Sequence, residues 1–176
     1  MSLDESNSQA RQEIERLRAE RDEARAQLRE SRTMLQMVMD NLPLQIYWKN
    51  RELVFVGCNQ LYAECFDLKH SDEVIGKTEE QLNAFASSPF AGLFEEREKE
   101  VMAHGIPQFH AIEQVEIDGE TVWLDVSHVP LFRQGVVMGV LGTFENITDR
   151  VKDEEELRNH RSEEHTSELP VTTHNL

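Results

Sequence analysis

The sequence predicts an α+β protein: a five-stranded antiparallel sheet with short helices on one face, preceded by a long N-terminal coiled-coil helix. Three observations lead to this fold class. A heptad pattern of apolar residues runs through residues 11–40, two short strand-like runs with a polar turn follow it, and three more such runs lie further along. A helical pattern of about fifty residues separates the two groups of strands, so the helices should cover one face of a single sheet.

Residues 11–40 carry apolar side chains at alternating steps of three and four, which is typical of a coiled coil. The predicted dimer seam consists of Ile14, Leu17, Ala24, Leu28, Leu35 and Val38. Arg21 and Ser31 occupy its two polar positions. So narrow an apolar stripe is buried when two helices pair, which predicts a parallel homodimer; a solvated amphipathic helix is the alternative. Residues 1–10 are expected to be a disordered start.

The five predicted strands cover residues 44–49, 53–57, 108–117, 121–129 and 136–145. Asp118-Gly119 is a strong hairpin signal, and Pro130 is expected to end the fourth strand. Asn59 suits the N-cap of a helix over 60–66. Two one-turn helices over 71–76 and 78–82, a helix over 90–104 that Gly105 stops, and a last helix over 151–160 complete the plan.

The acidic charge of the chain is concentrated in its predicted globular part. Residues 41–160 hold ten Lys and Arg against twenty-two Asp and Glu, whereas 11–40 are balanced at seven against seven. A binder of phosphate backbones needs a basic face, so nucleic acid is a poor candidate partner. We find no apolar run long enough for a membrane span and no secretory signal, which leads us to expect a cytoplasmic protein.

Catalytic and metal-binding motifs are missing from the sequence. Neither Gly-rich phosphate loop, G-x-x-x-x-G-K-S/T or G-x-G-x-x-G, occurs. A kinase phosphoacceptor box and a Gly-Gly-Asp/Glu-Glu-Phe cyclase signature are also absent, so we do not expect an enzyme. Cys58 and Cys65 have neither redox nor zinc spacing. Pairing about the Asp118-Gly119 turn sets His110 opposite Ser127 and Phe109 opposite His128, so the two His point to opposite faces and share no metal.

Residues 35–158 resemble a PAS sensor domain with its PAC-type C-terminal extension. The matching pieces, in order, are Asp40-Asn-Leu-Pro43, Phe55-Val-Gly-Cys-Asn59, Glu73-Val-Ile-Gly-Lys-Thr78, Asp118-Gly119, Trp123-Leu-Asp-Val-Ser127, Val129-Pro-Leu131, Gly139-Val-Leu-Gly142 and Asn146-Ile-Thr148. The resemblance implies a five-stranded sheet that cups a small pocket, next to which the coiled coil enters. The signal exit would be Asn146, Ile147 and Thr148. Asn146 stands where the family usually has Asp, so a neutral hydrogen bond is expected in place of a salt bridge.

The pocket that the resemblance implies would be lined by bulky side chains: Ile46, Trp48, Phe55, Phe85, Phe94, Met102, Phe109, Trp123, Leu141 and Phe144, with Phe90 nearby. A plain packed core is the alternative. The expected cofactor is none, or an unknown small molecule. The sequence disfavours Cys-adduct flavin, since 78–85 hold no Cys, and haem, since the helix interior over 90–102 holds no His.

The domain plan is therefore a disordered start at 1–10, a coiled-coil signalling helix at 11–40, a PAS sensor domain at 41–148 and an exit helix at 149–160. Residues 161–176 begin with a stretch that matches the translation of a sequencing-library adapter, and we interpret them as a non-native or disordered tail. The predicted function is a sensory and dimerisation module of a signal transduction protein, most simply a sensor histidine kinase. Its partners would be a second copy and a downstream output domain. A diguanylate cyclase module, a structural interaction module without ligand and a Cys-His hydrolase are the alternatives.

Overall fold

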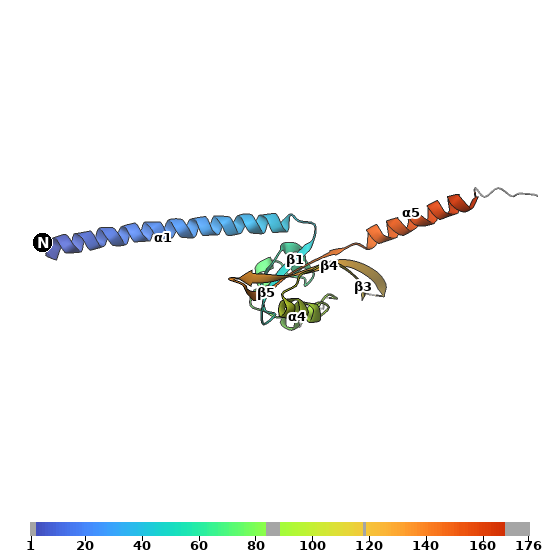
Figure 1. Ribbon diagram of the computed structural model, residues 1–176. Coiled ribbons are helices and arrows are strands. Elements are labelled where there is room, and N and C mark those ends of the chain that lie inside the picture. The colour runs from blue at the N-terminus through green and yellow to red at the C-terminus, as the bar shows by residue number, and fades with distance from the viewer. Residues whose placement is uncertain (1–2, 84–88, 118, 168–176) are drawn as a thin grey trace, which may run out of the picture. The chain divides into compact units, whose positions relative to one another are not determined.

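The computed structural model describes residues 3–83, 89–117 and 119–167 (Figure 1). Their contacts divide the chain into two compact units, Met1–Leu42 and Pro43–Leu176. The first unit is α1 (Leu3–Asp40), one continuous helix of 38 residues. It begins at Leu3 instead of residue 11, so the expected disordered start is wrong from Leu3 on. The reason is that neither Gly nor Pro interrupts the sequence before Pro43.

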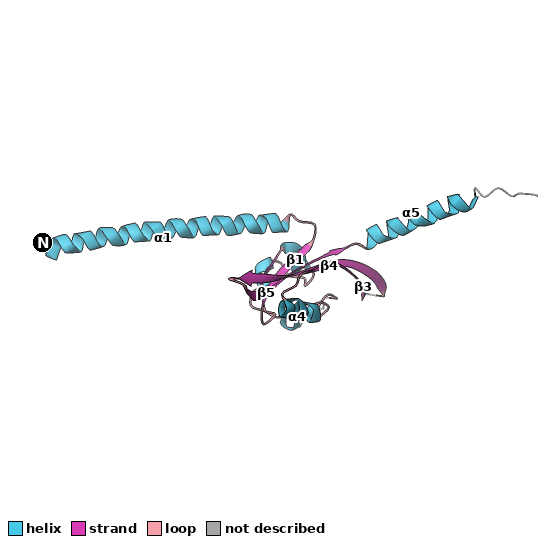
Figure 2. Ribbon diagram, viewed as in Figure 1, coloured by secondary structure: helices cyan, strands magenta, loops and turns pink. Residues whose placement is uncertain are grey.

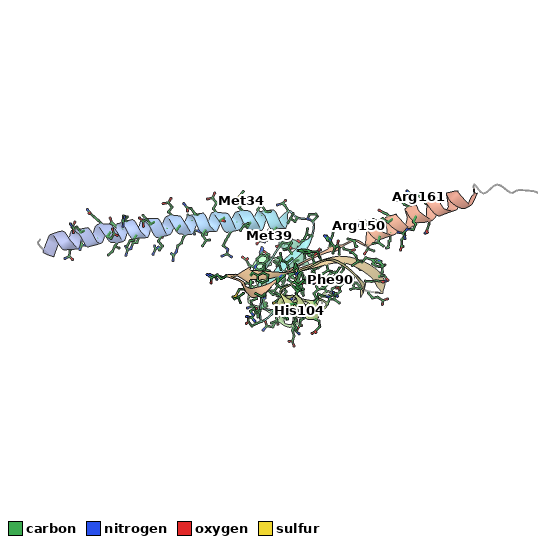
Figure 3. The ribbon with its side chains drawn as sticks, viewed as in Figure 1. Met34, Met39, Phe90, His104, Arg150 and Arg161 are labelled. Carbon is green, nitrogen blue, oxygen red and sulfur yellow. The ribbon has the colours of Figure 1, made fainter. Side chains whose placement is uncertain are left out.

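The predicted seam of α1 lies on the surface of that helix. Five of its apolar members are about half exposed or more: Ile14, Leu17, Leu28, Leu35 and Val38, at 48 to 63%. Figure 3 shows the side chains of α1 projecting outward along the helix. A single helix cannot bury such a stripe by itself, so these residues are available to a partner.

The second unit is built on a five-stranded antiparallel sheet (Figure 2). Its strands are β1 (Gln45–Asn50), β2 (Phe55–Cys58), β3 (Gln108–Ile117), β4 (Glu120–Arg133) and β5 (Val136–Asn146). Their order across the sheet is β2-β1-β5-β4-β3, which places the first and the last strand of the chain side by side. Because β1 and β5 are neighbours, the two halves of the sequence form one sheet, as the strand plan required.

Helices cover one face of this sheet. They are α2 (Gln60–Glu64), the 3-10 helix η1 (Ser71–Val74), α3 (Glu79–Asn83) and α4 (Glu95–His104), and α4 packs on β4 and β5 (Figure 1). The buried core between helices and sheet is largely aromatic, with Tyr47, Phe55, Tyr62, Phe66, Phe94 and Phe144 among its members. The side chain of Asn59 caps α2 by accepting from the Tyr62 amide, as its position in the sequence predicted.

Beyond α1, the boundaries that differ most from the prediction are those of β4, α4 and α5. Strand β4 continues through Pro130 to Arg133 by pairing with β5. The pairing with β3 ends at His128, so Pro130 needs no N–H on the β3 side of the strand. Helix α4 begins at Glu95, not at residue 90. The last helix, α5 (Thr148–Ser167), extends past residue 160 into the predicted tail, since no Gly or Pro occurs between Thr148 and Pro170.

The pairing of β3 with β4 also differs near His110. Gln108 lies opposite His128 and Ala111 opposite Val126, so the ladder shifts register between Gln108 and Ala111. His110 lies in this irregularity with a φ of 52°. The predicted pair of Phe109 with His128 is therefore wrong, whereas His110 stays beside Ser127, whose hydroxyl accepts from the His110 amide at 3.1 Å. None of the helices in the described ranges combines the length and the apolar character that a membrane crossing requires.

Candidate functional site: a buried ion cluster

Strand β1 presents a charged residue to the interior. Alternation along the strand places Tyr47 and Lys49 on the face that the helices cover, and Ile46 and Trp48 on the opposite face. Tyr47 is fully buried and Lys49 is 2% exposed. A lysine so deeply buried needs partners for its charge, because transfer of an unpaired ammonium out of water costs several kcal/mol or more.

Two carboxylates supply those partners. The Lys49 Nζ donates to both carboxylate oxygens of Glu98, at 2.8 and 2.9 Å, and to Oε1 of Glu79 at 2.5 Å. The ammonium also lies 4.9 Å from the centre of the Tyr47 ring and 4.8 Å from that of Phe55. Lys49, Glu79 and Glu98 are called the ion cluster below.

The ion cluster connects the sheet to its helical cover. Lys49 comes from β1, Glu79 from the first turn of α3 and Glu98 from α4. The second oxygen of Glu79, Oε2, accepts from the Gly92 amide at 2.6 Å, which ties the segment before α4 to the same point. A movement at the cluster would therefore act on β1, on α3 and α4, and on the segment before α4 at once.

A neutral polar pair lies beside the ion cluster. The Tyr47 hydroxyl is 3.1 Å from Nε2 of His128, a residue of β4 that is 1% exposed. Aromatic rings border this region: the centre of the Phe94 ring lies 5.6 Å from that of the His128 ring and 5.5 Å from that of the Phe144 ring. Phe90, labelled in Figure 3, lies 5.1 Å from Phe144. The interior thus combines a few polar groups with an aromatic wall, as small-molecule sites do.

Burial shifts the pKa values of these groups in the direction that favours the neutral form of each. Burial raises the pKa of Glu98, and the nearby Lys49 charge opposes that rise. Burial, with help from the charge of Lys49, lowers the pKa of His128 to about 4, so this imidazole is neutral at pH 7. Burial, together with the charge of Glu98, also raises the pKa of Tyr47 well above its usual value. Perturbed groups of this kind gather at functional sites more often than elsewhere.

The predicted pocket residues do not all face this interior. Phe55, Phe94 and Phe144 are buried there, each at most 2% exposed. Four others lie on the opposite face of the sheet, because they alternate with core residues along their strands: Ile46, Trp48, Trp123 and Leu141. Phe109 is 60% exposed, next to the irregular pairing of β3. Met102 is half-buried on α4, and Phe85 lies outside the described residues.

The predicted exit residues form a hydrogen-bonded start to α5. The Asn146 side-chain oxygen accepts from the Thr148 amide at 3.0 Å and from the Thr148 hydroxyl at 2.6 Å. The Trp123 amide donates to the Thr148 hydroxyl at 2.9 Å, and the Ile147 amide donates to the Trp123 carbonyl at 2.8 Å. These neutral bonds fasten the beginning of α5 to β4, where an Asp would have added a charge.

The pocket residues predicted from the sequence do not include the buried polar residues Tyr47, Lys49, Glu79, Glu98 and His128. The signal for Lys49 was present, because it lies two residues after Tyr47 and shares its face of the strand. The predicted pocket instead includes Trp48, which lies on the opposite face. No local signal separated Glu79 and Glu98 from the many exposed acids around them, since only the packing of α3 and α4 buries them.

The fold and this interior agree with the family to which the chain can be matched. A family model described as the PAS fold matches residues 39–152, so the chain belongs to the PAS fold family, whose members are sensory domains typical of signalling proteins. No curated protein matches the chain.

Several solved structures are similar to this chain in fold. Vibrio cholerae VqmA, as a dimer without its target DNA, is 24% identical, with a TM-score of 0.53 over 66% of this chain and 52% of that one. The PAS domain of Bordetella pertussis BvgS is also 24% identical at a TM-score of 0.53, over 77% of this chain and 98% of that one. The phage VqmA–DPO complex is 18% identical, with a TM-score of 0.54 over 78% of this chain and 62% of that one. The chain thus spans about half of VqmA, and these identities show the fold alone.

Proposed function

We propose that this chain is the sensory and dimerisation module of a signal transduction protein, and that its own activity is binding and relay, not catalysis. The observation that carries the proposal is the ion cluster inside the fold. A buried ion triad is weak evidence for stability, because apolar residues of similar volume often serve as well or better. Its position between β1 and the helices α3 and α4 suits a site whose occupancy changes how they pack.

Ligand binding by proteins of this fold supports the sensory part of the proposal. The phage VqmA structure is a complex with DPO, and a Vibrio cholerae VqmA structure is a complex with a ligand and DNA, so proteins of similar fold bind ligands. That support is an analogy of fold, and it does not carry DPO over to this chain. The neutral His128, the tyrosine hydroxyls and the ion cluster are this chain's own groups for recognition.

The exposed seam of α1 supports the dimerisation part. A second copy in parallel would bury Leu17, Leu28 and Leu35 against their equivalents, which is the pairing that heptad helices favour. The parent protein would be a sensor histidine kinase, because residues 154–160 of α5 are similar to the linkers that precede kinase domains. A diguanylate cyclase would connect to its output domain in the same way and is the second candidate.

The oligomeric state of the full chain tests the relay. Native mass spectrometry or light scattering should give the mass of two copies. Leu28→Glu places a charge in the seam and should give one copy, whereas the matched change Gln27→Glu, one position outside the seam, should leave two. A monomeric wild-type chain, or a Leu28→Glu chain that stays dimeric, would contradict pairing through α1.

The same spectra separate a sensor from a structural module with a filled core. A reproducible additional small mass on the native chain, lost on denaturation, supports sensing. A native mass equal to that of the polypeptide alone, from several preparations and growth conditions, favours a structural interaction module.

A further inference from the structure

The two acidic partners of Lys49 are held with different firmness. Glu98 places both carboxylate oxygens on Nζ, belongs to the ten-residue helix α4 and is fully buried. Glu79 contributes one oxygen to Nζ, belongs to the five-residue helix α3 and retains 8% exposure. Of the two, Glu79 is therefore the partner that can leave with the smaller rearrangement.

The charge count of the interior also marks Glu79 as the exchangeable group. One carboxylate suffices to balance the Lys49 ammonium, and Glu98 already does so with two hydrogen bonds. The second carboxylate brings a net negative charge into the core, and among the described residues the bonds that offset its desolvation are those to Nζ and to the Gly92 amide. If another carboxylate took its place, Glu79 would regain its hydration and the interior charge would stay the same.

We propose that Lys49 and the Gly92 amide form the binding site of a small monocarboxylate, and that Glu79 occupies the carboxylate position in the chain without ligand. This inference rests on the proposed sensory function and names the ligand class of that site. The ligand replaces the Glu79 carboxylate at both donors. Helix α3 then loses its bond to β1, so occupancy is reported as a change in how the cover packs on the sheet.

A cationic ligand fits this interior less well. It would have to enter in addition to the groups already present, where the rings of Tyr47 and Tyr62 lie 4.6 Å apart and those of Phe55 and Tyr62 5.6 Å. It would also meet the Lys49 ammonium at the same two carboxylates. A carboxylate ligand needs only the volume and the donors that Glu79 gives up.

The test follows the backbone amide signal of Gly92 by NMR while sodium acetate is added to the full-length chain. Acetate should shift this signal in the wild-type chain with saturation, whereas sodium chloride at equal ionic strength, the neutral isostere acetamide and methylammonium chloride should not. If acetate leaves the Gly92 signal unchanged in the wild-type chain, the proposal is wrong. A shift caused by methylammonium and not by acetate would assign the site to cations.

Variants then assign the competition to Glu79. Removing an internal competitor raises the apparent affinity, so Glu79→Ala should bind acetate roughly tenfold or more tightly than the wild-type chain. Glu80→Ala, an exposed neighbour on the same helix, should leave the affinity unchanged, and Lys49→Met should abolish binding. Glu79→Gln keeps the shape of the side chain and serves if Glu79→Ala does not fold. Equal affinity in wild-type and both Glu79 variants would overturn the exchange.

Failure of this inference is distinguishable from failure of the proposed function. A chain that is dimeric through α1 and carries a small bound mass, but does not respond to acetate, would keep the sensory role and lose only the carboxylate class. A chain that is monomeric, with an acetate response at Gly92, would keep this site and lose the relay.

Discussion

Replacing Lys49 by methionine removes the positive charge from the ion cluster and preserves most of the side-chain volume. Glu98 and Glu79 then remain buried without the ammonium at 2.5 to 2.9 Å from their oxygens. With an effective dielectric constant of about 20, one such contact contributes roughly 6 kcal/mol of Coulomb attraction, and desolvation of each ion opposes it by several kcal/mol.

The net cost of Lys49→Met should therefore be roughly 3–5 kcal/mol, the range observed when one partner of a buried pair is removed. That is a large part of the total stability of a domain, which is about 5–15 kcal/mol. Denaturant unfolding of the full chain, followed by tryptophan fluorescence, measures it. The matched change Lys99→Met removes a half-exposed lysine that pairs with Glu95 on α4 and should have a far smaller effect.

The pH dependence of this cost provides a second check. Burial raises the pKa of Glu98, and loss of Lys49 would raise it further. A raised carboxyl pKa contributes stability at low pH that is lost as the pH rises through the folded-state value. The difference between Lys49→Met and wild type should thus be smaller at acidic than at neutral pH. A cost below about 1 kcal/mol at neutral pH would refute the reasoning, because it would place the carboxylates in water instead of the core.

Three further changes test other parts of the interior. The lowered pKa of His128 should cost the wild-type chain about 3 kcal/mol of stability as the pH falls from about 6.5 to about 4, because the unfolded chain takes up this proton first. His128→Asn should remove that loss, and unfolding free energies measured across the same pH range test it. Asn59→Ala should cost roughly 2–4 kcal/mol by denaturant unfolding, because its side chain bonds the Ile46 amide at 2.9 Å, the Tyr62 amide at 3.1 Å and the Leu44 carbonyl at 2.8 Å. Gly142→Ala should cost about 1–3 kcal/mol in the same assay, since an added Cβ would lie 2.2 Å from the Tyr47 ring; a variant as stable as wild type would mean that this ring can move aside.

Local sequence patterns predicted the order of the helices and strands and the packing of helices on one face of the sheet. The heptad run predicted α1, Asp118-Gly119 predicted the β3–β4 hairpin and Asn59 predicted the cap of α2, because periodicity, turn chemistry and capping act over a few neighbouring residues. Together these signals fixed an α+β chain with one antiparallel sheet, and they did so without any contact between distant residues.

The charged interior was decided by tertiary structure. Glu79 and Glu98 lie 30 and 49 residues from Lys49 along the chain. Nothing in the sequence near either carboxylate distinguishes it from an exposed acid. Only the packing of α3 and α4 over β1 brings both acids to one ammonium and removes water from all three. Local alternation separates Trp48 and Leu141 from the core residues of their strands, but packing decided which face of the sheet the helices cover. The amino acids determined which elements form; the burial that gives this site its chemistry arises from the way those elements close on one another.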